Sequence, residues 1–205
     1  MKIFFDLDGT LLNSKPRLYY LFQFLVPESK FTYEIYWKLK QDKVTHRELL
    51  AKYFDYTEED VSNFNNEWMS LIETPEWLLH DKLFDGINPF LNLLKDNNEL
   101  YVVTARQFEE VVLQQIEDLH LGGIFSDVLV TLQKTEKQDL IRSKFELSSN
   151  DWIIGDTGKD IEAGKKLGIK TAAVLSGFLN KKRLIPYNPD IIINNVTNFK
   201  LVDNF

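Results

Sequence analysis

The 205-residue chain contains five short apolar runs, rich in β-branched or aromatic residues, that alternate with segments of helical periodicity. Runs of this length and composition predict strands that are buried on both faces. The predicted strands are residues 2–6, 99–104, 127–131, 152–156 and 171–175, with a peripheral strand at 190–194, and the predicted helices are 89–95, 107–119, 136–145 and 160–167. This alternation predicts an α/β fold, with a Rossmann-like parallel sheet core and helices on both faces. Such sheets bind ligands at the carboxyl ends of their strands.

A long stretch after the first strand interrupts this pattern. Residues 15–83 show helical rather than strand periodicity, which predicts an inserted all-helical cap domain. Residues 1–14 and 84–205 then form the core. Two sequences in the insert, beginning at Thr45 and Thr57, resemble helix N-caps. Aromatic residues are frequent there, and rings such as Tyr19, Tyr33 or Trp37 could line a pocket, but packing of the insert's own core is the favoured interpretation.

Composition argues against several classes of function. The formal net charge of −7 disfavours sequence-independent binding to nucleic acid, which needs a basic surface. The absence of cysteine rules out disulfides, thiolate nucleophiles and cysteine-ligated zinc, so oxygen-ligated metals remain. The apolar run at the N-terminus is far too short for a signal peptide or a membrane span. We therefore expect a cytoplasmic protein, a monomer or homodimer, with neither nucleic acid nor membrane as a partner.

Four carboxylates follow two of the predicted strands. Asp6 and Asp8, in the run DLDGT, lie where the first strand ends, and Asp156 and Asp160, in the run GDTGKD, follow the fourth. Taken alone, the first run has an ordinary alternative, since Asp-Gly is a common turn pair. Because parallel strands bring their carboxyl ends together, the four acids should converge, which is costly unless a cation neutralises them. Magnesium is the cation that fits best.

Residues after the second and third strands suit a phosphate group. Thr104, followed by Ala105 and Arg106, would place a hydroxyl group and backbone N–H groups at the same rim, although threonine is also a common helix N-cap. The Arg106 guanidinium could pair with an anionic group of the substrate, or lie exposed in the first turn of a helix. Lys134 and Lys137 both follow the third strand closely. We prefer Lys137, because it lies at the start of a predicted helix.

Together these elements resemble the haloacid dehalogenase-like hydrolase superfamily, in its phosphatase branch with a helical cap after the first strand. The DxDGT run at Asp6, the threonine at Thr104, a lysine near Lys137 and the GDxxxD run at Asp156 match in order and rough spacing. The segment IIGDTGKDIEAGKKLGIKTAAVLSGF, which ends at Phe178, is similar to phosphoglycolate phosphatase relatives. The lysine motif lacks the proline that follows it in many relatives, which leaves Lys134 as an alternative to Lys137.

The resemblance implies a phosphatase that hydrolyses a small-molecule phosphate monoester through an aspartyl-phosphate intermediate, with Mg²⁺ as cofactor. Asp6 would be the nucleophile. Asp8 would protonate the leaving group and then deprotonate the attacking water; the first task needs a protonated carboxyl group, which neighbouring acids and partial burial would promote. The metal site would comprise Asp6, Asp8 through its backbone carbonyl, Asp156 and Asp160, and the phosphate would be bound by Thr104, Ala105, Arg106 and Lys137.

Several alternatives stay open. Asp8 argues against carbon–halogen hydrolysis, because a halide leaving group needs no proton. A sugar phosphomutase of the same superfamily would share the four motifs and differ mainly in its cap contacts. A non-catalytic binding or regulatory protein on the same fold would have no physical need for both Asp6 and Asp8. In the insert, His46 and Arg47 begin a predicted helix and are weaker candidates for substrate contacts. No motif identifies the substrate, because specificity depends on cap residues.

Overall fold

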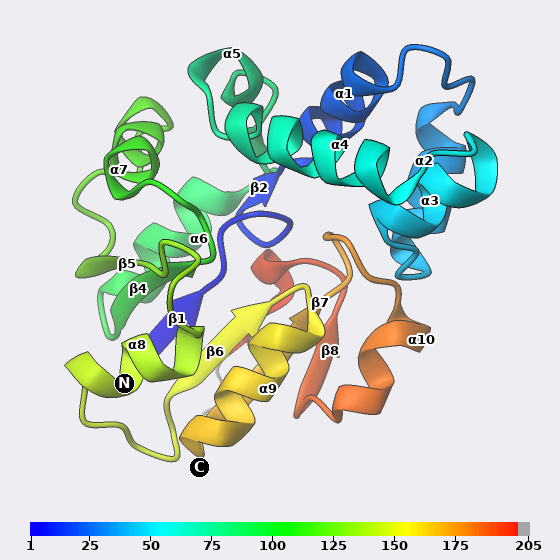
Figure 1. The fold of residues 1–205 in the computed structure, drawn as a ribbon. Coiled ribbons are helices and arrows are strands. Elements are labelled where there is room, and N and C mark those ends of the chain that lie inside the picture. Colours follow the sequence, from blue (N-terminus) through cyan, green and yellow to red (C-terminus); the bar gives the residue numbers. More distant parts are fainter. Residues whose placement is uncertain (201–205) are drawn as a thin grey trace.

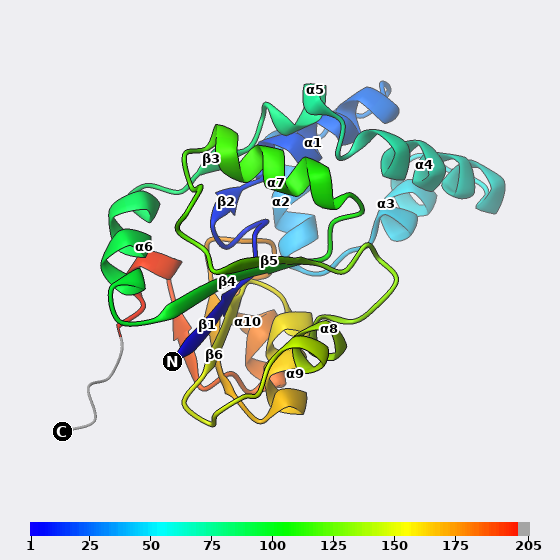
Figure 2. The same ribbon diagram turned by 90° about the vertical axis from the view of Figure 1, so that its left-hand side faces the viewer.

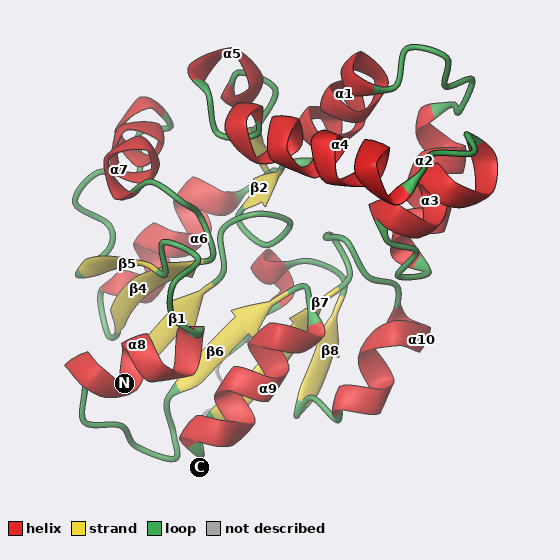
Figure 3. Cartoon of the chain, viewed as in Figure 1, coloured by secondary structure: helices red, strands yellow, loops and turns green. Residues whose placement is uncertain are grey.

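The computed structural model describes residues 1–200 and shows a six-stranded parallel sheet between layers of helices (Figures 1 and 3). The strands are β1 (Lys2–Phe5), β4 (Glu99–Thr104), β5 (Asp127–Val130), β6 (Trp152–Gly155), β7 (Lys170–Val174) and β8 (Ile191–Ile193). Their order across the sheet is β5-β4-β1-β6-β7-β8. The predicted Rossmann-like α/β fold is confirmed, and the late strand lies at the edge of the sheet as expected.

Alternating side chains of the strands bind helices to both faces of the sheet, because successive residues of a strand point to opposite sides. Ile3 and Phe5 pack on one face with Leu91 of α6, whereas Phe4 packs on the other with Ile141 of α8. Figure 2 shows α6 and α7 on one side of the sheet and α8 and α9 on the other. The core helices are α6 (Ile87–Lys95), α7 (Glu109–Asp118), α8 (Lys137–Lys144), α9 (Gly158–Leu167) and α10 (Lys181–Leu184), with short 3₁₀ turns at Ile185–Tyr187 and Val196–Asn198.

Five helices lie between β1 and α6 and sit over the carboxyl ends of the strands (Figure 1). They are α1 (Lys15–Leu25), α2 (Tyr33–Gln41), α3 (His46–Tyr53), α4 (Glu58–Leu71) and α5 (Pro75–Leu78). The two predicted N-caps are confirmed, since Thr45 and Thr57 each form a capping box, with Glu48 and Asp60. No helix within residues 1–200 combines the length and the apolar character that crossing a membrane requires.

A small antiparallel ladder joins the two chain segments that lead to and from these helices. β2 (Leu12–Asn13) pairs with β3 (Lys82–Leu83). This pairing was not predicted, because two-residue strands are too short to show an alternating pattern in the sequence. The ladder brings both connections together at one place, next to the loop that follows β1, where Asp8 forms an isolated bridge with Leu12.

The aromatic residues of the five helices form a core of their own. Phe22, Tyr36 and Phe64 are buried there, and the Tyr19 hydroxyl donates a hydrogen bond of 2.9 Å to the Phe31 carbonyl. These rings therefore pack in the core of the insert, as the favoured interpretation predicted. Trp37 also reaches the sheet domain, since its ring stacks on Phe178, with centroids 5.6 Å apart.

Candidate active site

The order of the strands brings the predicted site residues to one rim. β1 lies between β4 and β6, so the ends of these three strands are neighbours. Asp6 directly follows β1 and its backbone N–H donates to the Ile154 carbonyl of β6 at 2.8 Å, which extends the pairing by one residue. Thr104 is the last residue of β4, and Asp156 directly follows β6. The predicted convergence of these residues is present in the structure.

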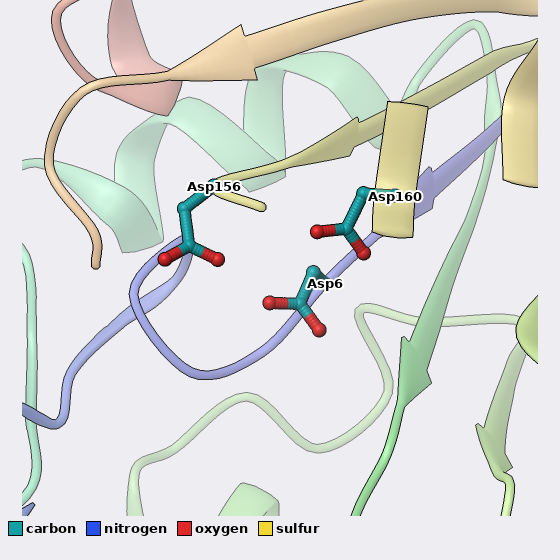
Figure 4. A group of neighbouring side chains, drawn as sticks. All are labelled: Asp6, Asp156 and Asp160. Carbon is teal, nitrogen blue, oxygen red and sulfur yellow. The ribbon is translucent and has the colours of Figure 1, made fainter. Parts of the chain in front are cut away.

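Three carboxylates face one another at this rim, as Figure 4 shows for Asp6, Asp156 and Asp160. Each contributes an oxygen atom that lies within 4.8 Å of the other two, and all three residues are buried. Burial raises the pKa of Asp6 to about 7, against the lowering effect of Lys137. Burial, and then the charges of Asp6 and Asp160, raise the pKa of Asp156 well above its usual value. Like charges at this spacing are unfavourable without a counter-ion.

Asp156 provides the observation that tests whether a metal ion fits. Its Oδ2 accepts a hydrogen bond of 2.6 Å from the backbone N–H of Phe178, but its Oδ1 is buried and has no hydrogen-bond partner. Gly9 and Gly177 leave room beside this carboxylate, since a Cβ atom on either residue would clash with it. Burial of a carboxylate oxygen without a partner costs free energy. Coordination of a hard divalent cation by that oxygen would offset the cost. The donor set therefore fits an ion such as Mg²⁺.

Asp160 and Lys137 are held by each other and by the start of α9. Asp160 Oδ2 accepts hydrogen bonds from the backbone N–H and the hydroxyl group of Thr157, at 3.1 and 2.6 Å. Lys137 Nζ lies 2.6 Å from Asp160 Oδ1 and 2.5 Å from Asp6 Oδ1. Burial opposes the charge of this lysine, but Asp160 and Asp6 raise its pKa above the usual value. Lys134 lies exposed in the loop before α8, so the structure places Lys137, and not Lys134, beside Asp6.

Asp8 has very different neighbours from Asp6. Arg106 donates to it in bidentate fashion, from Nε at 2.5 Å and from Nη2 at 2.7 Å, while Arg17 Nη2 lies 2.6 Å from Oδ1. The Ser14 hydroxyl donates to the same oxygen at 2.5 Å. Burial alone would raise the pKa of Asp8, but Arg106 and Arg17 hold it well below the usual range. The expectation that neighbouring acids promote a protonated Asp8 is therefore wrong for this arrangement, because two arginines occupy the positions next to it.

A second carboxylate balances these two arginines. Asp81 lies 3.3 Å from Arg17 Nε and 3.3 Å from Arg106 Nη2, and it accepts a hydrogen bond of 2.9 Å from Gln115. The side chains of this network are buried or nearly buried. The positive charges of the two arginines are therefore balanced by the negative charges of Asp8 and Asp81. The alternative of an exposed Arg106 is therefore wrong, because the side chain is buried. Pairing of Arg106 with an anionic group of the substrate stays a prediction: the residue lines the cavity, and its Nη1 has no hydrogen-bond partner within residues 1–200. Arg17 and Asp81 were not among the predicted site residues, since neither belongs to a recognisable motif.

Thr104 and Ala105 line the cavity in front of the carboxylates. The alternative role of Thr104 as a helix N-cap is wrong, because α7 begins at Glu109 and its N-cap is Phe108. The weaker candidates in the insert do not reach the cavity. His46 Nε2 lies 3.0 Å from the Tyr36 hydroxyl within the aromatic core, and Arg47 pairs on the surface with Glu58.

The cavity has a volume of about 300 Å³ and lies between the rim of the sheet and the inserted helices. All predicted site residues of the core except Asp160 line it, and the core also supplies Gln133, Thr157, Lys159 and Phe178. The helices supply the opposite wall, which consists of Arg17, Leu18, Trp68, Met69, Ile72 and Glu73. Apart from the general expectation that the insert contacts the substrate, no signal in the sequence singled out these residues.

A family model described as haloacid dehalogenase-like hydrolase matches residues 3–174, which is most of the chain. The chain belongs to this family. The superfamily that the motifs predicted is therefore confirmed, and the members that it resembles are phosphohydrolases.

The similarity to known relatives extends over nearly the whole chain. A phosphoglycolate phosphatase of Aquifex aeolicus is 30% identical, over 98% of this chain and 96% of the relative. The pyrophosphatase PpaX of Bacillus pumilus is 24% identical, over 95% and 92%. Among solved structures, a haloacid dehalogenase-like family protein of Streptococcus pneumoniae superposes with a TM-score of 0.78 at 22% identity, over 95% of this chain and 93% of that one. The predicted enzyme class, a phosphohydrolase, is supported by the names of the curated relatives.

Proposed function

We propose that this hydrolase is a Mg²⁺-dependent phosphatase, which hydrolyses a small-molecule phosphate monoester through a phosphoryl group carried on Asp6. One observation supports this most directly. Asp6 lies beside a buried carboxylate oxygen of Asp156 that has no partner, and beside the ammonium group of Lys137. The names of the curated relatives, which are phosphatases and pyrophosphatases, agree with this proposal.

In this proposal Asp6, Asp156, Asp160 and the backbone carbonyl of Asp8 hold the metal ion. When bound, the ion offsets the negative charge of the carboxylates and of the substrate phosphate. Lys137 contributes a second positive charge on the same side, and Thr104 with the backbone N–H groups after β4 binds the remaining phosphoryl oxygens. These groups surround the place where charge spreads over the phosphoryl oxygens in the transition state.

The reaction then takes two displacements. An Asp6 oxygen forms a bond to phosphorus while the bond from phosphorus to the ester oxygen breaks, and Asp8 donates a proton to that leaving oxygen. Asp8 next takes a proton from a water molecule, whose oxygen attacks phosphorus and releases Asp6. The contacts of Asp8 with Arg17 and Arg106 must loosen for the first proton transfer, because both arginines favour the ionised carboxylate. Arg17 belongs to α1, so a movement of the inserted helices changes this contact.

We further propose that residues 15–83 act as a cap domain that closes over the cavity, with the β2–β3 ladder as its hinge. The contacts between the two parts support a closed arrangement. Trp37 stacks on Phe178, Asn180 Nδ2 donates to Asp42 at 3.1 Å, and the backbone N–H of Gln107 donates to Glu73 at 2.9 Å. Closure of this kind excludes water from the reacting groups.

Phosphate release from a panel of phosphate monoesters, with Mg²⁺ and with EDTA, tests the proposal. We expect release that needs the metal and that disappears in Asp6→Asn. Asp139→Asn, an exposed aspartate on α8, is the matched control and should behave as the unmodified protein. Folded protein that binds Mg²⁺ without releasing phosphate from any ester would refute the phosphatase, and activation by a sugar bisphosphate without net release would identify a phosphomutase.

A further inference from the structure

The wall of the cavity opposite the carboxylates is mainly apolar, and in the proposed reaction it faces the leaving group of the ester. Trp68 and Met69 of α4, Ile72 at its end and Leu18 of α1 lie opposite the carboxylates, and Phe178 of the core closes the same wall. All five side chains are half-buried. Burial of an apolar group against such a surface is favourable, whereas burial of a charged group against it is not.

Each cationic side chain that lines the cavity, within the described part of the chain, already has a carboxylate partner. Lys137 contacts Asp6 and Asp160, and the two arginines share Asp8 and Asp81. Lys159 is exposed and lies 3.6 Å from Glu136. If Arg17 or Arg106 turned to a substrate anion, Asp81 would remain buried with fewer partners, which is a costly change.

Glu73 adds a negative charge to the same wall. Its carboxylate is 5% exposed and accepts hydrogen bonds from the backbone N–H of Gln107 at 2.9 and 3.1 Å. It forms no ion pair with a lysine or arginine within residues 1–200. A second anionic group on the substrate would therefore meet repulsion in a poorly solvated place.

We infer that the preferred substrate is a phosphate monoester of an uncharged, partly apolar alcohol, and that esters with a carboxylate in the leaving group are disfavoured. This inference rests on the proposed phosphatase function and assigns the leaving-group side to Trp68, Ile72 and Glu73. The inference therefore gives this chain a different substrate preference from the one that the name of its phosphoglycolate phosphatase relative indicates for that protein.

Three primary alkyl phosphates test the inference at similar leaving-group chemistry: benzyl phosphate, 2-phosphoglycolate and the neutral amide of 2-phosphoglycolate. With Mg²⁺ at neutral pH, we expect kcat/KM to be highest for benzyl phosphate and about tenfold or more lower for 2-phosphoglycolate, with the amide between them. A higher kcat/KM for 2-phosphoglycolate than for both neutral esters would overturn the inference.

Two variants assign the effect to the wall. Glu73→Gln removes the charge but retains an oxygen that accepts from Gln107, so we expect the ratio of 2-phosphoglycolate to amide to rise about fivefold. Trp68→Ala should lower kcat/KM for benzyl phosphate about tenfold, mainly through KM, and affect the amide less. Glu76→Gln, an exposed residue of α5, is the control and should change neither ratio. Ratios within one protein are independent of the fraction that folds.

Binding to Asp6→Asn separates this inference from the proposed function. Calorimetric titration of that variant with the same three esters should rank them in the same order, whether or not the unmodified protein releases phosphate. Tightest binding of 2-phosphoglycolate would refute the inference even if the enzyme is a phosphatase. No turnover of any ester, with benzyl phosphate bound tightest, would instead refute the phosphatase and leave the apolar preference supported.

Discussion

The two halves of the cavity, one lined by the core and the other by the proposed cap of residues 15–83, differ in the balance of their side chains: the core half is mainly polar and charged, and the cap half is mainly apolar, with Arg17 and Glu73 as its charged members. On the core half, Lys137 pairs with Asp6 and Asp160 at the ends of strands and helices, and Asp156 faces both carboxylates. On the cap half, residues such as Trp68 and Ile72 offer apolar surface from α4 and its end. In the function proposed above, this difference places the chemical step and the choice of ester on separate parts of the chain. Changes on the core half should affect all esters, and changes on the cap half should alter their ranking.

The same contrast exists within the core half, between two aspartates that are two residues apart. Asp6 faces a lysine and two further carboxylates, and burial raises its pKa to about 7. Asp8 is clamped by Arg106 and Arg17, which lower its pKa far below that of Asp6. Both shifts are opposite to what the proposed tasks need, because a nucleophile acts in its ionised form and a general acid in its protonated form. In the proposal, a bound cation therefore lowers the pKa of Asp6, and loosening of the arginine contacts raises that of Asp8.

The largest predicted effect tests the claim that the core half acts on every ester. Asp6→Asn should lower kcat on the order of 10⁴-fold, because an amide oxygen is a poor nucleophile toward phosphorus. The loss should be equal for benzyl phosphate and for the amide of 2-phosphoglycolate. Steady-state phosphate release at saturating Mg²⁺ measures it, with thermal unfolding as a check on the fold. A variant that loses activity on one ester and retains it on another would break the division between the halves.

The second prediction separates Asp8 from Asp6. Asp8→Asn should lower kcat/KM about 10²- to 10³-fold for benzyl phosphate, because an alkoxide leaving group needs a proton. For 4-nitrophenyl phosphate the loss in kcat/KM should be much smaller, because nitrophenolate leaves without one. The measurement is kcat/KM on both esters for Asp8→Asn and for Asp6→Asn, since kcat also contains the hydrolysis of phosphorylated Asp6, which is the same step for both esters. Equal losses in kcat/KM on the two esters in Asp8→Asn would remove the acid role from Asp8.

The third prediction concerns the network that joins the two halves. Asp81→Asn leaves Arg17 and Arg106 with Asp8 as their remaining carboxylate in the network, so we expect the free energy of unfolding to fall by about 3 kcal/mol. Urea unfolding followed by tryptophan fluorescence measures the change. The matched control is Asp85→Asn, four residues further on and exposed, which should stay within about 0.5 kcal/mol. Equal stability of the two variants would show that Asp81 does not hold the arginines in place.

The smallest effect lies in the cap and depends on pH. His46 lies against the Trp68 and Phe64 rings, with centroids 4.3 and 5.2 Å away, and burial followed by the charge of Lys40 lowers its pKa well below the usual value. Below about pH 6.5 the unfolded chain gains a proton at this residue and the folded chain does not. Stability should therefore fall by about 1.4 kcal/mol per pH unit below that value, and the contribution vanishes above it.

His46→Gln isolates this contribution, because glutamine retains a group that can bond with the Tyr36 hydroxyl. We expect the stability difference between the two proteins to change with pH from 5 to 6.5 and to be constant from 7 to 8. Comparison of the two proteins cancels the carboxylates of the core half, whose pKa values also change on folding. A difference that is independent of pH across the whole range would mean that His46 has the same pKa in the folded protein as in the unfolded chain, which contradicts the prediction.

The predictions from the sequence succeeded where a pattern repeats or where chemistry is local. The six strands were found from apolar runs, and two cap-helix starts from threonines followed by an acid three residues later. The convergence of Asp6 with Asp156 followed from the rule that parallel strands end at one edge. The β2–β3 ladder was missed because two residues show no period, and the helix after β4 begins two residues later than predicted.

The sequence by itself determined the α/β core, the place of the acidic rim and the reaction class, because backbone periodicity and the spacing of charged residues are written along the chain. Only the tertiary structure decided the neighbours of Asp8 and the wall that faces the leaving group. Arg17, Asp81 and Arg106 are far apart in sequence, and their meeting depends on how the inserted helices pack on the sheet. The proposed specificity depends on that packing, since an apolar residue such as Trp68 lines the cavity only because of the direction in which its helix faces.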